Sequence, residues 1–249
     1  PNETAKAETM TEQLFRDDSY LASCEATVVA VNDRGGIVLD RTVFYPTGGG
    51  QPGDRGTLET AAGPVDIATT VYGEDKSEIV HVPAEGQALP TPGTKVTCRI
   101  DWERRHRLMR MHTALHLLSA VLPYPVTGGQ IGEDEGRLDF DIPDAGLDKD
   151  EIAAAVNRLA DEGRTVGMRF ITDAELDADP GLVKTMSVKP PRGTGRVRLI
   201  EVDGADLQPC GGTHVRSTAE IGPIEVAKIE KKGRQNRRVR IRFAGGEAA

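Results

Sequence analysis

Two short motifs, far apart in the sequence, carry side chains that bind metals. The first, at 112–116, reads HTALH, and the second, at 208–214, reads QPCGGTH. Together they offer three imidazoles and one thiolate, a donor set suited to tetrahedral zinc. Two compatible pairs in one chain predict a single shared zinc ion, with four ligands: His112, His116, Cys210 and His214.

The spacing within each motif suits two donors aimed at one point. His112 and His116 are four residues apart, so both imidazoles lie on one face of a helix. Cys210 and His214 flank a Gly-Gly pair whose backbone freedom lets the chain curl. Either motif alone is more often an ordinary pair of polar or core side chains, so the prediction depends on their combination.

Two familiar classes of zinc protein fit poorly. A zinc peptidase carries its general-base glutamate directly after the first histidine, where this chain has Thr113. A zinc finger needs closely paired cysteines, which are absent.

A glycine-rich segment at 44–54, FYPTGGGQPGD, is the second conspicuous motif. No Gly-Lys-Ser/Thr follows, so it is not a phosphate-binding P-loop. Successive glycines let backbone approach a ligand closely. The expected ligand contacts are the backbone of Gly48, Gly49 and Gly50 and the side chains of Thr47 and Gln51. The alternative is a hairpin loop without a ligand.

Basic residues gather in two runs, at 104–110 and 228–242, although the formal net charge of the chain is −8. Such segregation is typical of a phosphate-binding face, and the alternative is a solvated charged face. Aromatic residues make up only 4% of the chain, so backbone and shape recognition of a folded RNA is favoured over base stacking. The candidates for tRNA contact are Arg104, Arg105, Lys231, Lys232, Arg234, Arg237 and Arg238.

The elements that must position these groups fall into two regions. Short β-branched runs separated by turn residues predict a small β-barrel or sandwich over 21–100. Beyond it, apolar residues three or four apart predict helices at 102–122 and 148–161, with a third starting near Thr172. Strands are expected at 196–202, 224–229 and 238–243. The predicted class is α+β, with a polar tail at 1–20, a β domain at 21–100 and an α+β domain at 101–249.

Composition indicates the cellular location and excludes some classes of binding partner. Three widely spaced cysteines give no disulfide framework and indicate a reducing, cytoplasmic location. No apolar stretch approaches the length of a membrane span. The acidic balance, with a pI near 5.3, argues against a general DNA binder.

The two metal motifs, the glycine-rich segment, and the runs VTGGQ at 126–130 and RLDF at 137–140 resemble one known family. From about residue 12 onward the chain is similar to the free-standing alanyl-tRNA editing proteins, the AlaX family, in their medium-length form. These proteins are similar to the editing domain of alanyl-tRNA synthetase. The resemblance implies a small β-barrel followed by the two-layer α/β editing fold shared by threonyl- and alanyl-tRNA synthetases.

The resemblance also implies an activity. It is the ATP-independent hydrolysis of the ester that joins serine, or glycine, to tRNA(Ala), sparing alanine, at one zinc ion. Gln130 matches the glutamine near the family's site, and Arg137 is expected to contact substrate. The position before the second histidine, often Thr in the synthetase, is Leu115 here, so Thr47 is the candidate for sensing serine.

The implied partner is the acceptor end of tRNA(Ala), with no membrane or DNA, and the protein is expected to be a monomer or weak dimer. The main alternative is an accessory tRNA-binding module with a purely structural zinc. A fragment of a full synthetase is disfavoured, because nothing before residue 100 resembles an aminoacylation domain.

Overall fold

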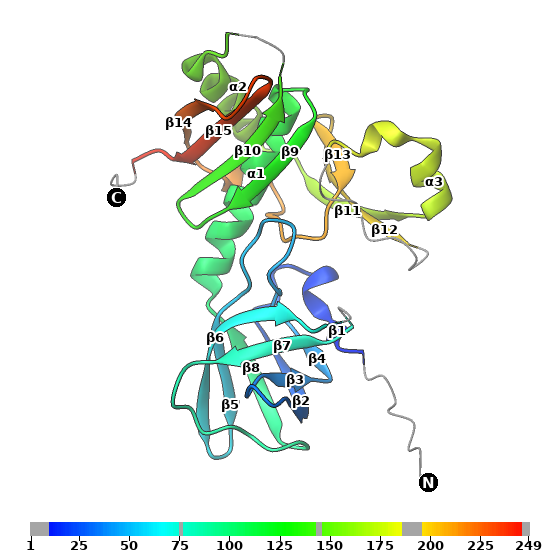
Figure 1. Cartoon of the computed structure of the whole chain (residues 1–249), viewed down its shortest axis with the longest axis vertical. Helices are drawn as coiled ribbons and strands as arrows, with labels where there is room; N and C mark the ends of the chain where they lie inside the picture. Colours follow the sequence, from blue (N-terminus) through cyan, green and yellow to red (C-terminus); the bar gives the residue numbers. More distant parts are fainter. Residues whose placement is uncertain (1–9, 75–76, 143–145, 186–195, 246–249) are drawn as a thin grey trace. The chain divides into compact units, whose positions relative to one another are not determined.

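The structure is a computed structural model, and it describes residues 10–74, 77–142, 146–185 and 196–245. The chain divides into two compact units, shown in Figure 1. The first comprises Pro1–Gly48 and Pro52–Arg105, and the second comprises Gly49–Gln51 and His106–Ala249. The middle of the glycine-rich segment is therefore grouped with the second unit.

The first unit is built on a closed six-stranded barrel with the strand order β2-β3-β7-β6-β5-β8. β-branched runs like those expected over 21–100 lie in its strands, and residues 32–36 connect β2 to β3. In β6 and β8 buried and more exposed side chains alternate, as expected for strands with one face toward the barrel core, whereas all three residues of β3 are buried. The strands are β2 (Ser23–Val31), β3 (Ile37–Leu39), β5 (Gly56–Thr60), β6 (Gly63–Tyr72), β7 (Ile79–Pro83) and β8 (Lys95–Ile100).

The sequence predicts a polar tail at 1–20, but the part of this segment that the structure describes contains a strand and a 3-10 helix. Strand β1 (Glu12–Gln13) pairs with β4 (Arg41–Thr42), and the 3-10 helix η1 (Leu14–Arg16) follows. Phe15 is buried against Tyr45 and Ile79. Residues 1–9 lie outside the described part of the chain.

The second unit contains a four-stranded sheet, β14-β15-β10-β9, and a three-stranded sheet, β11-β12-β13. The α+β class and the barrel predicted from the sequence are confirmed. The strands are β9 (Val126–Ile131), β10 (Glu135–Asp141), β11 (Val166–Ile171), β12 (Val197–Val202), β13 (Asp206–Pro209), β14 (Ile224–Lys231) and β15 (Asn236–Phe243). The helices are α1 (Trp102–Val121), α2 (Lys149–Asp161), α3 (Asp173–Ala178), η2 (Pro180–Leu182) and η3 (Thr218–Glu220).

Helix α1 is buried on all sides beyond its first turns. Every residue at 111–119 is buried, on faces that point in all directions. In Figure 1 strands β9 and β10 lie in front of this helix. A Cβ on Gly136 of β10 would lie 2.9 Å from the Met111 side chain and 3.0 Å from that of Leu115. The sheet therefore packs on α1 through the face that carries Gly136.

The other two α-helices begin at the predicted places. Asp148 caps α2 by accepting hydrogen bonds from the amides of Asp150 and Glu151. Thr172 and Glu175 form a capping box at the start of α3. No described helix is long and apolar enough to cross a membrane.

Candidate metal centre

The structure brings the four predicted metal ligands together. The donor atoms of His112, His116, Cys210 and His214 all lie within 4.8 Å of one another. The Cys210 sulfur is 3.6 Å from His112 Nε2 and 3.3 Å from His214 Nε2. The three imidazoles are buried. Such a cluster of nitrogen and sulfur donors is the arrangement that holds a transition metal.

Two elements deliver the ligands. Helix α1 presents His112 and His116 one turn apart, with ring centroids 5.2 Å apart. Strand β13 leads directly into Cys210, and the loop after it is tied down by Arg198 of β12. Arg198 Nη1 donates to the carbonyls of Cys210 and Gly212, at 3.0 and 2.9 Å. The loop is therefore fixed by backbone contacts as well as by its ligands.

Gly212 is needed for close approach. A Cβ there would lie 2.3 Å from His112 Cε1 and 2.9 Å from Gln51 Oε1, so no side chain fits. Gly211, by contrast, has nothing within 4 Å of the corresponding position. The requirement for glycine therefore arises at one of the two positions, from contact with the His112 ring.

The hydrogen-bond network fixes the tautomer of His112. The Thr213 amide can only donate, and it faces Gln51 Oε1 at 3.2 Å, so that atom is an oxygen. The same oxygen lies 3.0 Å from His112 Nδ1, which must therefore carry the proton. His112 Nε2 is then left with a lone pair, and it is the atom that faces Cys210.

The same logic applies to His214. The Thr113 hydroxyl donates to the Met109 carbonyl at 2.9 Å, so toward His214 Nδ1, at 3.1 Å, its oxygen accepts. His214 Nδ1 therefore carries the proton and Nε2 is bare. Thr113 occupies the position at which a zinc peptidase has glutamate, and here it orients the His214 ring through Nδ1.

His116 has a charged partner. Its Nδ1 lies 2.9 Å from Asp206 Oδ2, and the other oxygen of this buried carboxylate pairs with Lys184. Gln208 donates to the same carboxylate at 2.8 Å and to Ser119 at 3.2 Å. A carboxylate behind a histidine fixes its tautomer and raises its basicity. All three imidazoles thus turn Nε2 toward the centre of the cluster.

Burial and neighbouring charges shift the pKa values of Cys210, His116 and His214. Burial alone would raise the pKa of the Cys210 thiol, but neighbouring histidines, His112 and His214 first, hold it well below its usual value. Burial would lower the pKa of His116, yet its bonds to Asp206 and Cys210 raise it to about 9. Burial and the charge of His112 lower the pKa of His214 well below its ordinary value. Without a metal, His116 is therefore a protonated imidazole beside the Cys210 thiolate. A metal cation would replace that proton, because these side chains ligate metals as thiolate and neutral imidazole.

The glycine-rich segment contributes to the site through Gln51. The Gln51 side chain is fully buried, and besides His112 it holds the Thr213 hydroxyl through Nε2 at 2.8 Å. The carbonyl of Gly50 accepts from the Ile131 amide at 2.8 Å, and Gly49 is exposed. In this structure the Gln51 side chain holds the predicted metal ligand His112, and its expected contact with substrate remains a prediction.

Thr47 and Gly48 belong to the first unit. The Thr47 hydroxyl donates to the Thr70 carbonyl at 3.2 Å and accepts from the Gly53 amide at 2.9 Å. The Gly48 carbonyl accepts from the Tyr45 hydroxyl at 2.9 Å. These bonds shape the loop, while the Thr47 side chain stays exposed.

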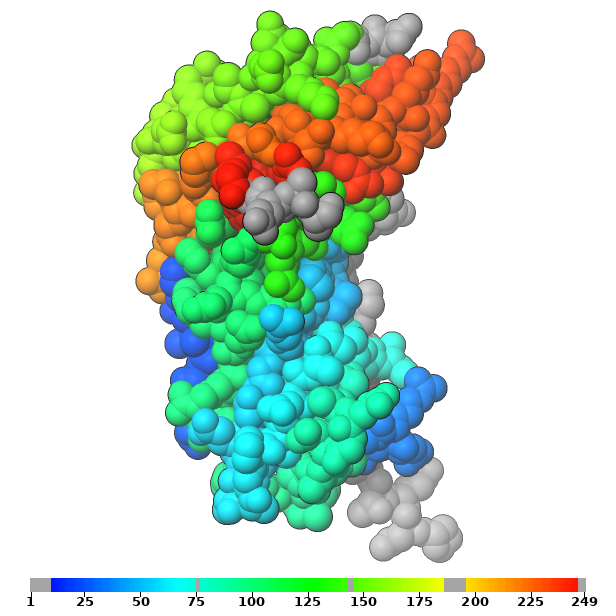
Figure 2. Space-filling model, turned by 90° about the vertical axis from the view of Figure 1, so that its left-hand side faces the viewer, coloured from blue at the N-terminus to red at the C-terminus, as the bar shows by residue number. Residues whose placement is uncertain are grey.

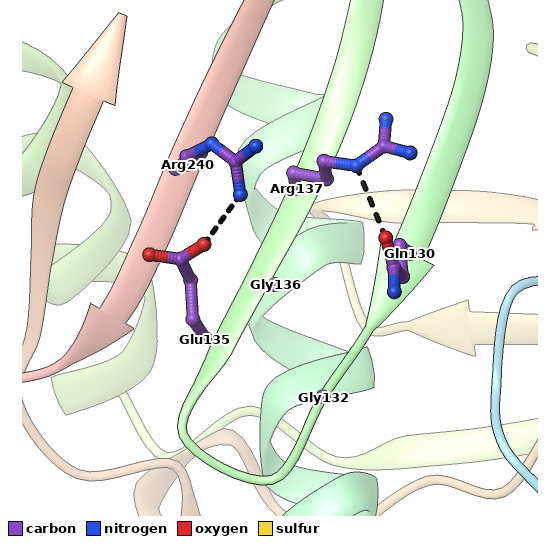
Figure 3. Close-up of a pocket in the computed structure, with 6 residues that line it drawn as sticks. All are labelled: Gln130, Gly132, Glu135, Gly136, Arg137 and Arg240. Atoms are coloured by element: carbon purple, nitrogen blue, oxygen red, sulfur yellow. Dashed lines mark hydrogen bonds and ion pairs between the residues drawn. The ribbon is translucent and has the colours of Figure 1, made fainter. Parts of the chain in front are cut away.

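Gln130 and Arg137 lie on the sheet face that points away from helix α1, and the catalytic and substrate-binding roles expected of them remain predictions. They are register partners on β9 and β10, so they share one sheet face, opposite the face on which Gly136 packs against α1. Figure 3 shows their side chains on that outer face, where Arg137 Nε donates to Gln130 Oε1 at 3.3 Å. With Arg240 and Glu135 they line a shallow polar pocket. Neither side chain points toward helix α1, which carries His112 and His116.

Arg105, predicted to contact tRNA, is a fully buried structural residue. Its Nε lies 3.0 Å from both carboxylate oxygens of Asp54, and its other nitrogens donate to the carbonyls of Ser19 and Val43. Asp54 also accepts from the Tyr45 amide. No part of this guanidinium reaches solvent, so it cannot bind a phosphate.

The other predicted tRNA contacts fall into two groups. Arg238 is paired with Asp139, Lys232 pairs with Glu230, and Arg237 is buried and donates to backbone carbonyls. Lys231 and Arg234 are exposed near the tip of the β14–β15 hairpin, and Arg104 is half-buried and donates to the Gly53 carbonyl. The hairpin, orange to red, projects from the surface in Figure 2. The best-placed cations are therefore Lys231 and Arg234.

Sequence reasoning missed the residues behind the ligands. Asp206 and Gln208 precede Cys210 at intervals of two, the spacing that places side chains on one face of a strand. A strand that ends at a metal ligand with polar residues at this interval is a usable signal. Thr113 and Lys184 carried no comparable signal.

Two family models match the chain. Residues 197–240 match the "Threonyl and Alanyl tRNA synthetase second additional domain", and residues 3–104 match "tRNA synthetases class II (A)". The second match contradicts the expectation that nothing before residue 100 resembles a synthetase domain. The fold and the cluster thus occur in a chain related to the class II tRNA synthetases.

Curated relatives cover almost the whole chain. The alanyl-tRNA editing protein AlaX-M of Methanosarcina acetivorans is 36% identical over 241 residues, which are 92% of this chain and 98% of that protein. AlaX-M of Saccharolobus solfataricus is 35% identical over 237 residues, with the same coverage. The alanine–tRNA ligase of Pyrobaculum neutrophilum is 37% identical over 237 residues, 89% of this chain but 25% of the ligase. The chain belongs to the AlaX-M family of alanyl-tRNA editing proteins.

Proposed function

We propose that this protein is a hydrolase that removes a wrong amino acid from tRNA(Ala), acting on tRNA charged elsewhere. Its substrate is seryl-tRNA(Ala), with glycyl-tRNA(Ala) as a second candidate, and alanyl-tRNA(Ala) is spared. The observation that carries the proposal is the buried cluster of three Nε2 atoms and one sulfur. It lies in a chain that matches AlaX-M editing proteins over 92% of its length.

The reaction needs no energy source. Water adds to the ester carbonyl carbon, the bond to the ribose oxygen breaks, and a proton passes to that oxygen. The products are the free amino acid and tRNA with a free terminal hydroxyl. Hydrogen-bond donors fixed in a water-poor pocket favour the oxyanion that forms on the way.

The proposed ion is zinc, held by His112, His116, Cys210 and His214. When bound, zinc supplies positive charge that can polarise a carbonyl or acidify water. The protein's own contribution is orientation. Each imidazole is held from behind by a hydrogen bond to its Nδ1, and Arg198 fixes the loop that carries Cys210.

Selectivity for serine over alanine requires a group that forms a hydrogen bond with the side-chain hydroxyl of serine. Thr47 is our candidate, because its two internal bonds use its proton and one lone pair and leave the oxygen a second acceptor position. A site built around such a bond disfavours alanine, which leaves the position unpaired.

A second function is supported by the completeness of the ligand set. Four protein donors fill a tetrahedral zinc shell, as in structural sites, whereas catalytic zinc usually keeps a position open. In this alternative the metal only holds the fold, and the protein binds tRNA without cleaving it.

The deciding experiment measures amino acid release from seryl- and alanyl-tRNA(Ala) by the wild type and the Cys210→Ser variant, with zinc quantified in each. We expect rapid loss of serine, retention of alanine, and dependence on Cys210. A folded, zinc-loaded wild type that cleaves neither ester would favour the tRNA-binding alternative.

A further inference from the structure

Gln51 is the one residue of the glycine-rich segment whose side chain reaches the ligand cluster. The side chain has no exposed surface, and all of its polar atoms are used. Oε1 accepts from His112 Nδ1 and from the Thr213 amide, at 3.0 and 3.2 Å, and Nε2 donates to the Thr213 hydroxyl at 2.8 Å. A buried amide with this set of partners is held in one orientation.

The loop that carries Gln51 is held on β9 by its neighbour, Gly50. The Gly50 carbonyl accepts from the Ile131 amide at 2.8 Å. A Cβ on Gly50 would lie 2.8 Å from the Gly129 carbonyl oxygen, and φ of Gly50 is +83°. Any side chain at this position therefore pushes the loop off the strand.

We propose that Gln51 is a positioning residue that fixes the ring and tautomer of His112 and thereby sets the affinity of the cluster for its metal. The proposal rests on the metal site of the proposed function. Without the Gln51 oxygen, the proton of His112 is free to move to Nε2, and the ligand lone pair is lost. Partners of this kind typically change metal affinity by about 10- to 100-fold.

The same contact links the loop to the metal. Because the bond to His112 forms only when the loop is seated on β9, metal binding and loop placement favour each other. Such coupling is reciprocal. A change that unseats the loop weakens metal binding without touching a ligand.

The first test compares two substitutions of Gln51 in the full chain. Gln51→Leu keeps the volume but removes every polar contact. Gln51→Glu keeps an oxygen for His112 Nδ1 and for the Thr213 amide, and the Thr213 hydroxyl can turn to donate to it. We expect Leu to weaken zinc binding about 10- to 100-fold and Glu to restore binding close to the wild type.

The second test leaves Gln51 in place. Gly50→Ala introduces the clash with Gly129, whereas Gly49→Ala is the matched control. Gly49 also has a positive φ, +58°, but nothing lies within 4 Å of its Cβ position. Both variants carry similar backbone strain, so a loss of zinc affinity confined to Gly50→Ala identifies loop seating as the cause.

Two measurements decide the proposal. One is zinc affinity by competition with a chromogenic chelator. The other is nitrogen NMR of His112 in metal-free protein, which reports which ring nitrogen carries the proton. Gln51→Leu should shift the tautomer toward Nε2–H, and unchanged affinity and tautomer in a folded variant would overturn the proposal. If the wild type itself bound no zinc, the proposed function would fail, while the tautomer measurement would still test Gln51.

Discussion

His116 Nδ1 lies 2.9 Å from the carboxylate of Asp206, and this carboxylate has no exposed surface. A histidine ligand with a buried carboxylate behind it holds its metal more tightly, because the carboxylate fixes the ring and increases its basicity. Lys184 pairs with the second oxygen and so balances the buried charge.

The Asp206→Asn variant tests this relationship. It keeps the shape but removes the charge and turns a donor toward Lys184. We expect zinc affinity to fall about 10- to 100-fold, measured by chelator competition. The control is Asp203→Asn. Asp203 is an exposed carboxylate in the turn between β12 and β13, and this variant should bind zinc like the wild type. Equal affinities for the two variants would contradict the role given to Asp206.

The buried pair of Arg105 and Asp54 should be a stability element. Arg105→Met leaves an uncompensated buried carboxylate and should cost about 3–5 kcal/mol of unfolding free energy. The double variant with Asp54→Leu should lose less than the sum of the single losses. Urea unfolding of the three variants checks this. If Arg105→Met were as stable as the wild type but bound tRNA more weakly, Arg105 would be a tRNA contact after all.

Lys231 and Arg234 are the cations we expect to meet tRNA phosphates. Replacing both with alanine should weaken tRNA binding and reduce the slope of log affinity against log salt by about one for each charge. Binding titrations at several salt concentrations measure both effects. Arg34→Ala removes an exposed cation outside the two basic runs and should leave the slope unchanged. If the double variant kept the wild-type slope, Lys231 and Arg234 would not contact tRNA phosphates.

Stability of the barrel unit should depend on pH through His81. Burial lowers the pKa of this histidine to about 4, while it accepts from Thr42 and donates to the Ile37 carbonyl. An unfolded chain binds its proton near pH 6.5, so the stabilisation is complete above that value and is lost as the pH falls toward 4. The loss should be on the order of 3 kcal/mol.

The measurement is unfolding free energy against pH for the wild type and His81→Asn. The variant lacks the titrating group, so its curve between pH 6.5 and 4 should be flatter, although its stability at pH 7 is lower. Parallel curves would show that other groups carry the pH dependence.

Substitutions of Thr47 test its proposed role in sensing serine. Thr47→Val removes the oxygen proposed to accept from the serine hydroxyl, so kcat/KM for seryl-tRNA(Ala) should fall while that for alanyl-tRNA(Ala) stays low. Thr47→Ser keeps the hydroxyl and should retain activity on serine. The lost internal bonds should also cost about 1–3 kcal/mol, visible as a lower Tm. If Thr47→Val retained full activity on serine, sensing would belong to another residue.

Local patterns in the sequence predicted much of the site. The four-residue interval of His112 and His116 identified one face of a helix, and the Gly-Gly pair identified the loop that carries Cys210. The sequence did not predict that Gln130 faces away from helix α1, because the face that a strand residue points to depends on register and on what packs behind the sheet. Its catalytic role remains a prediction. Asp206 was missed although it shares a strand face with Cys210, since its strand was not predicted.

Arg105 shows a different limit. It stands among three other arginines on one helix, and nothing local distinguishes the buried cation from its solvated neighbours. Its partner Asp54 lies 51 positions away. Only the three-dimensional structure shows that Asp54 neutralises Arg105. Likewise, only the structure shows that the Gln51 amide bonds His112 and Thr213.

Helix α1 has no face left for solvent along the stretch that carries both histidines. A helix of this kind gains little from forming alone, since its apolar surface is satisfied only when the surrounding strands are in place. The second unit should therefore fold in one cooperative step, without a stable intermediate that contains only part of it. The ligand cluster would then appear and disappear together with the whole unit, instead of melting as a separate part.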